Sequence, residues 1–280
     1  MPSHVARRAQ YQDILGHLSR VYGQLIPSGA NWGQISFNEG EFLMNRILDE
    51  QPRHVLEIGT AGGASAVHIL KALGMLGGER RFTTVECLEH CYFDPSRKPG
   101  FLVEQAYGAL PEGFYPYSGL GSFDLGQVLA EAPPVDFLFV DANHGHPWAS
   151  LDTALALPFL APNSMAVYHD INLHLLCAAT KSRDRGAHHL FYHLPARQKQ
   201  TVGDLPYPNI GSLRLVGPAK AIMADLLSVM FHFPWEAAAW PPLDLETLLR
   251  FKAFLGKHFG RQYVAAFMHG LEALGLQGNA

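Results

Sequence analysis

The residues with the clearest chemical potential surround a glycine-rich turn, Glu57-Ile58-Gly59-Thr60-Ala61-Gly62-Gly63-Ala64-Ser65. An apolar run precedes this turn and a helical pattern follows it, which predicts a strand that feeds a helix. Such a turn offers backbone N–H groups and a helix N-terminus to a ligand. The carboxylate of Glu57 is poorly placed for a pyrophosphate. It suits a ligand with an ammonium group, whose own carboxylate the turn and the Ser65 hydroxyl could bind.

A second acidic residue, Glu86, ends the next predicted strand. A carboxylate at this place in a strand–turn–helix–strand unit can accept hydrogen bonds from both ribose hydroxyls of an adenosine. That geometry serves a nicotinamide dinucleotide and other adenosine ligands equally. Glu86 therefore indicates an adenosine ligand without choosing among them.

A third group of polar residues follows two later predicted strands. Asp141, His144 and His146 come directly after the apolar run 135–140, and Asp170 follows the run 164–169. Aspartate oxygens are ligands for Mg²⁺, and a bound cation lowers the pKa of a hydroxyl that attacks a substrate. A histidine can take such a proton near neutral pH. The residues leave metal-assisted and metal-free chemistry open.

Strands and helices alternate through most of the chain, which predicts a doubly wound, Rossmann-like, mostly parallel sheet with helices on both faces. Ligands of such sheets bind at the carboxyl ends of the strands. We expect N-terminal helices before the sheet, with Asn38 as the N-cap of the second, and a C-terminal helical extension. The predicted strands are 54–58, 81–86, 114–118, 135–140, 164–169 and 212–216. The predicted helices are 11–25, 37–48, 63–76, 101–110, 122–130, 147–157, 186–194, 219–231, 243–259 and 262–274.

The turn Glu57-x-Gly59-x-Ala61-x-Gly63 resembles motif I of class I S-adenosylmethionine-dependent methyltransferases. With Ser65 it is similar to the small-molecule O-methyltransferase branch, which includes catechol O-methyltransferase. The run Phe139-Val140-Asp141-Ala142-Asn143-His144 resembles the Asp-Gly-x-His signature of a bacterial methyltransferase subgroup, with Ala142 in place of the glycine. The resemblance covers about residues 30–172.

The resemblance implies transfer of a methyl group from S-adenosylmethionine to a small molecule, most often to a hydroxyl. It implies Asp141, His169 and Asp170 as ligands of a divalent cation, Mg²⁺ or Mn²⁺, with His169 in place of an acid. It implies His144 as the general base, with His146 as the competing base and Asp141 beside them. The cofactor-binding residues that it implies are Ser36, Glu57, Gly59, Thr60, Ala61, Gly63, Ser65, Glu86, Ser122 and Asp141.

Composition narrows the classes of partner. The net charge of −4 and the lack of a basic run exclude a nucleic-acid footprint. No apolar run is long enough to cross a membrane, and Met1–Gln10 lacks the apolar core of a signal peptide. Cys87, Cys91 and Cys177 lack metal-finger spacing and are interpreted as reduced thiols. We therefore expect a cytoplasmic protein.

The chain of 280 residues is predicted to divide into three parts. Residues 1–52 form a helical segment over the cofactor site, 53–217 the methyltransferase core, and 218–280 the helical extension. The resemblance further implies a homodimer. Two alternatives remain open at this point: a nicotinamide-dependent oxidoreductase on a similar sheet, and a non-catalytic protein that uses the fold as a scaffold.

Overall fold

The computed structural model describes residues 4–176, 183–203, 206–236 and 243–275, in two compact units, 1–120 and 121–280. Cys177 lies outside the described residues. The predicted division into 1–52, 53–217 and 218–280 stays a prediction. Three strands of the seven-stranded sheet belong to the first unit and four to the second.

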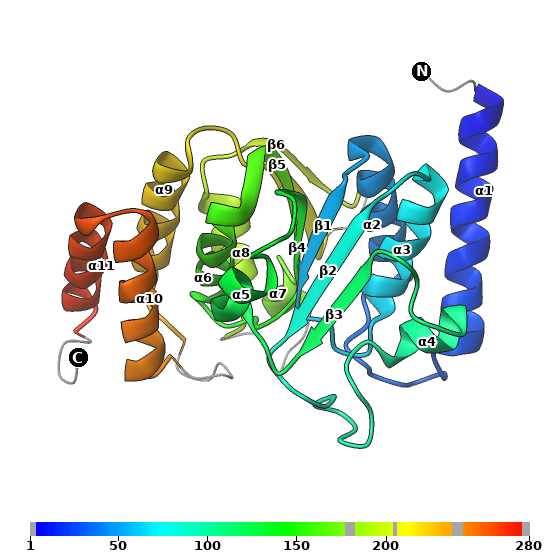
Figure 1. Ribbon diagram of the computed structural model, residues 1–280, viewed down its shortest axis with the longest axis horizontal. Helices are drawn as coiled ribbons and strands as arrows, with labels where there is room; N and C mark the ends of the chain where they lie inside the picture. Colours follow the sequence, from blue (N-terminus) through cyan, green and yellow to red (C-terminus); the bar gives the residue numbers. More distant parts are fainter. Residues whose placement is uncertain (1–3, 177–182, 204–205, 237–242, 276–280) are drawn as a thin grey trace. The chain divides into compact units, whose positions relative to one another are not determined.

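The first unit pairs its three strands in parallel, in the order β3-β2-β1. They are β1 (His54–Ile58), β2 (Arg81–Glu86) and β3 (Phe114–Ser118), with the predicted bounds. Every residue of β1 is buried, as expected for a parallel strand covered on both faces. The helices, shown in Figure 1, are α1 (His4–Arg20), the π-helical turn η1 (Val21–Leu25), α2 (Phe37–Glu50), α3 (Ala64–Leu76) and α4 (Phe101–Tyr107).

The N-cap of helix α2 differs from the one that the sequence predicts. The cap is Ser36, and the predicted cap Asn38 lies inside the first turn. The reason is a capping box: the carboxylate of Glu39 accepts a hydrogen bond from the Ser36 backbone N–H at 2.6 Å. The capping box therefore holds Ser36, the last residue before α2, in place.

The second unit has the strand order β4-β5-β7-β6. Strands β4 (Val135–Val140) and β5 (Leu160–His169) are parallel, whereas β7 (Ile210–Arg214) runs antiparallel to β5 and to β6 (Arg197–Thr201). The helices around them are η2 (Ser122–Asp124), α5 (Leu125–Val128), α6 (Trp148–Ala156), η3 (Leu157–Phe159), α7 (Leu173–Leu176) and α8 (Gly186–His193). The expectation of a mostly parallel α/β sheet is confirmed.

The C-terminal extension consists of α9 (Ala219–His232), α10 (Leu245–His258) and α11 (Arg261–Ala273), which lie side by side in Figure 1. Aromatic side chains join them: the ring of Phe267 contacts those of Phe231 and Phe251 at centroid distances of 5.7 and 5.1 Å. The three helices thus share one apolar seam. Within the described ranges, no helix is both long and apolar enough to cross a bilayer.

Candidate functional site

The glycine turn after β1 presents its backbone N–H groups to the acid at the end of β2. The N–H groups of Thr60 and Ala61 each donate to Glu86 Oε2 at 3.2 Å. Parallel pairing of β1 with β2 brings this about, because Ile58 lies opposite Val85 in the register. Gly59 and Gly63 have φ values of +96° and +89°, which favour glycine. The structure therefore brings Gly59, Thr60, Ala61, Gly63 and Glu86 together.

A close backbone contact explains why residue 63 is glycine. A Cβ atom at Gly63 would lie 2.7 Å from the Cα of Gly100. Backbone hydrogen bonds from Gly100 to Ala61 (2.9 Å) and from Leu102 to Gly62 (3.1 Å) hold this second segment against the turn. These bonds hold the turn and the segment that begins at Gly100 together.

Glu57 lies beneath the turn and is fully buried. Its Oε1 accepts a hydrogen bond from the Ser65 hydroxyl at 2.5 Å, and its Oε2 accepts one from the Thr84 hydroxyl at 2.6 Å. Glu57 and Ser65 thus bind each other. A direct contact of either residue with a ligand stays a prediction.

The two other serines predicted to bind the cofactor lie in different units. Ser36 is an exposed residue of the first unit and caps α2. Ser122 is buried in the second unit, where its hydroxyl donates to Asp152 Oδ1 at 2.6 Å. Burial raises the pKa of Asp152 to about 7, although the Ser122 hydrogen bond opposes this shift. The predicted roles of both serines toward a cofactor remain untested by these contacts.

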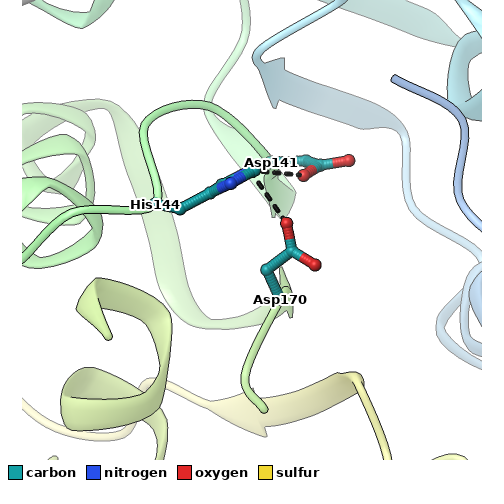
Figure 2. Close-up of side chains that lie close together, drawn as sticks. All are labelled: Asp141, His144 and Asp170. Carbon is teal, nitrogen blue, oxygen red and sulfur yellow. Dashed lines mark ion pairs between the residues drawn. The ribbon is translucent and has the colours of Figure 1, made fainter. Parts of the chain in front are cut away.

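Two aspartates and a histidine converge in the second unit (Figure 2). Asp141 follows β4, Asp170 follows β5, and His144 comes from the loop after β4. His144 Nε2 lies 2.8 Å from Asp170 Oδ2 and 3.8 Å from Asp141 Oδ1. In Figure 2 the imidazole points to both carboxylates. The parallel strands β4 and β5 thus deliver these side chains to one place.

His169 supports this cluster from the end of β5. The register pairs Val140 with Tyr168, so the next residues, Asp141 and His169, are neighbours. His169 Nδ1 lies 3.1 Å from Asp141 Oδ1 and 3.4 Å from Asp170 Oδ1. Two carboxylates therefore alternate with two imidazoles.

The alternation of charge governs how these groups titrate. Burial lowers the pKa of His144, but Asp170 and Asp141 outweigh it and raise that pKa to about 10. Burial also lowers the pKa of His169. Asp141 and Asp170 outweigh this effect and raise that pKa well above its usual value. In return, the histidines hold the pKa of Asp170 well below its usual range against the effect of burial. The aspartates and histidines thus favour one another's charged forms.

The general-base roles predicted for His144 and His146 stay predictions. A base must be neutral at the working pH, and Asp170 and Asp141 raise the pKa of His144 above its usual value. His146 is fully buried, its Nε2 lies 3.1 Å from the carbonyl oxygen of Met230, and burial lowers its pKa to about 4.

The loop that carries Asp141 and His144 is tied to a distant segment of the second unit by Glu236. The Glu236 carboxylate accepts hydrogen bonds from the backbone N–H groups of His146 (2.8 Å) and Arg185 (3.1 Å). The N–H of Gly186 donates to the carbonyl of His144 at 2.8 Å. These bonds hold the C-terminal end of the loop that follows β4.

The donor set of the cluster fits a divalent cation. Asp141, His144 and Asp170 each offer one ligand atom, and these atoms lie within 4.8 Å of one another. Carboxylate oxygens suit Mg²⁺ and Mn²⁺, and an imidazole nitrogen shifts the preference toward Mn²⁺ and its neighbours. The histidine in this set is His144, whereas the sequence predicts His169.

Sequence reasoning missed Asn209, which lies just before β7. Its side chain donates to Asp170 Oδ1 at 2.6 Å. The only sequence signal is its place in the turn Tyr207-Pro208-Asn209-Ile210-Gly211, ahead of a predicted strand. Pairing of β7 with β5, which the sequence does not reveal, brings Asn209 to Asp170.

Comparison with known proteins supports the methyltransferase class among those considered above. Residues 56–171 match the family described as "Methyltransferase domain". This range contains both motifs on which the resemblance depends, so the prediction of a methyltransferase is confirmed. The oxidoreductase and scaffold alternatives gain no support from it. No curated protein matches the chain.

Solved structures share the fold. The O-methyltransferase TomG from Streptomyces achromogenes, crystallised with SAM, is 21% identical with a TM-score of 0.51, covering 73% of this chain and 90% of TomG. The SAH-bound methyltransferase PaMTH1 from Podospora anserina is 15% identical with a TM-score of 0.51, covering 78% of this chain and 98% of that one.

Proposed function

From the methyltransferase domain at residues 56–171 and the shared fold, we infer that this protein is an S-adenosylmethionine-dependent methyltransferase. We propose that it methylates a hydroxyl group of a small molecule with the help of a divalent cation. The convergence of Asp141, His144 and Asp170 is the single observation that carries the second statement.

The glycine turn of the first unit is the proposed cofactor site. S-adenosylmethionine supplies a methyl group already activated by its sulfonium. Glu86 would accept hydrogen bonds from the ribose hydroxyls, and the turn would meet the amino-acid end through its backbone. Glu57 would contribute indirectly, because its carboxylate holds Ser65 and Thr84 beneath the turn. Ser36, Ser122 and Asp141 complete the set proposed from the sequence.

The cluster of the second unit is the proposed acceptor site. Asp141, Asp170 and His144 would hold the cation, which supplies a Lewis acid that lowers the pKa of a hydroxyl. His169 would keep the Asp141 carboxylate in place through its Nδ1–H. What these residues add to catalysis is orientation of the acceptor oxygen, since methyl transfer depends on alignment of the reacting atoms.

Calorimetry and a transfer assay test the two statements separately. We expect S-adenosylhomocysteine to bind and NAD not to bind. We expect methyl transfer to one member of a panel of catechols and glycosides, and its loss in EDTA. Binding of NAD without S-adenosylhomocysteine would refute the first statement, and full activity in EDTA would refute the second.

Two variants locate the cation. Asp141→Ala and Asp170→Ala are expected to abolish transfer while S-adenosylhomocysteine still binds. Asp225→Ala is the matched control, because it removes an aspartate of the same unit from helix α9, away from the cluster. Full activity of either cluster variant would contradict the proposed acceptor site.

We also propose that the protein is a cytoplasmic homodimer. The resemblance to small-molecule O-methyltransferases and the cysteine pattern of the sequence support this. Light scattering of the purified protein and fractionation of expressing cells would test it, and a monomer at micromolar concentration would contradict the dimer.

A further inference from the structure

Asn209 binds three consecutive residues of the turn that follows β5. Its Nδ2 donates to Asp170 Oδ1 at 2.6 Å, its Oδ1 accepts from the N–H of Asn172 at 3.1 Å, and its carbonyl accepts from the N–H of Ile171 at 3.2 Å. Asp170 and Asn209 are both buried, with 5% and 8% of their surface exposed. A single asparagine thus makes three hydrogen bonds with this turn.

The partners of Asn209 fix which way its amide faces. The N–H of Asn172 is a donor, so it must meet the amide oxygen, and the Asp170 carboxylate is an acceptor, so it must meet the NH₂ group. The same reasoning fixes the Asp170 carboxylate. Asn209 binds Oδ1, and Oδ2 is the oxygen that lies 2.8 Å from His144.

Asp170 needs such support because of its backbone. Its φ value is +58°, in the left-handed region that residues other than glycine seldom adopt. Asn209 is a donor to Asp170 that does not belong to the alternating cluster of carboxylates and imidazoles.

We propose that Asn209 is a positioning residue, which fixes one oxygen of Asp170 so that the other faces His144 and the cation. This inference rests on the proposed function, because it takes Asp170 as a ligand. Ligating carboxylates are commonly held by a hydrogen bond from a neighbouring group, and loss of that bond typically weakens metal binding 10- to 100-fold.

The turn itself has other supports, so the role of Asn209 can be separated from folding. The Asn172 side chain donates to the carbonyl of Pro208 at 2.7 Å and to the Tyr192 hydroxyl at 3.0 Å. His188 Nδ1 lies 2.9 Å from the carbonyl of Ile171. Truncation of Asn209 leaves these contacts and the β5–β7 ladder in place.

Titration with Mn²⁺, followed by electron paramagnetic resonance of the free ion, tests the proposal on the full chain. We expect Asn209→Ala to weaken Mn²⁺ binding 10- to 100-fold. Tyr192→Phe is the matched control. It removes the hydrogen bond between Tyr192 and Asn172, which belongs to the same network but does not involve Asp170. This variant should change Mn²⁺ affinity less than about twofold. Affinity for S-adenosylhomocysteine should stay at the wild-type value in both variants.

The outcomes separate the inference from the function on which it rests. Wild-type Mn²⁺ affinity in Asn209→Ala would overturn the positioning role while the cation site stands. An equal loss in both variants would also overturn it, since the effect would then be a general loosening of the turn. Failure of the wild-type protein to bind Mn²⁺ would refute the cation site itself, and the inference with it.

Discussion

Substitution of Gly63 by alanine should strongly destabilise the first unit. At φ +89° a Cβ atom costs about 1–2 kcal/mol. The added atom would also lie 2.7 Å from the Cα of Gly100, and backbone cannot move aside as a flexible side chain can. Overpacking of this kind costs about 1–3 kcal/mol. The expected loss in the free energy of unfolding is therefore about 2–5 kcal/mol.

Helix α3 supplies the control for this experiment. Gly74 lies in that helix and does not have a positive φ, and among the described residues a Cβ atom placed on it would meet no neighbour within 4 Å. Gly74→Ala should stabilise the protein by about 0.5–1 kcal/mol, because alanine favours a helix more than glycine does. Urea unfolding should show a lower free energy of unfolding for Gly63→Ala and a higher one for Gly74→Ala. A Gly63→Ala protein as stable as the wild type would refute the reasoning.

Three other outcomes are expected. Burial raises the pKa of Asp152 to about 7, above about 3.9 when unfolded, so the folded state holds a proton that the unfolded chain loses. Stability should fall as pH rises from about 4 through about 7, by up to about 4 kcal/mol, and Asp152→Asn should remove this slope from urea midpoints. Ser65→Ala deprives the buried Glu57 carboxylate of a donor and should cost about 1–3 kcal/mol in the same assay; no loss would contradict the contact. Glu86→Gln should weaken S-adenosylhomocysteine binding about tenfold or more by calorimetry, and unchanged affinity would remove Glu86 from the cofactor site.

Local patterns predicted the strands that are covered on both faces. The bounds of β1, β2 and β4 were predicted from short runs of apolar and β-branched residues, and the structure has the same bounds. Strand β6 was missed because its sequence, Arg197-Gln198-Lys199-Gln200-Thr201, is polar throughout. An exposed edge strand pairs through its backbone, and that pairing leaves no hydrophobic pattern.

The site was predictable where it depends on strand ends and unpredictable where it depends on distant pairing. Asp141 and Asp170 follow buried parallel strands, so their convergence could be expected. The approach of His144 to both carboxylates depends on how the loop after β4 bends, which no periodicity records. Asn209 reaches Asp170 only because β7 is antiparallel to β5.

The bonds made by Glu236 have a consequence for any exchange of parts between this enzyme and its relatives. This residue follows α9, some ninety positions after the loop that it holds through His146 and Arg185. A chimaera that took the loop after β4 from one parent and the C-terminal helices from another would separate two segments that these hydrogen bonds join. Crossovers placed before residue 121 keep these hydrogen bonds, because both segments then come from the same parent.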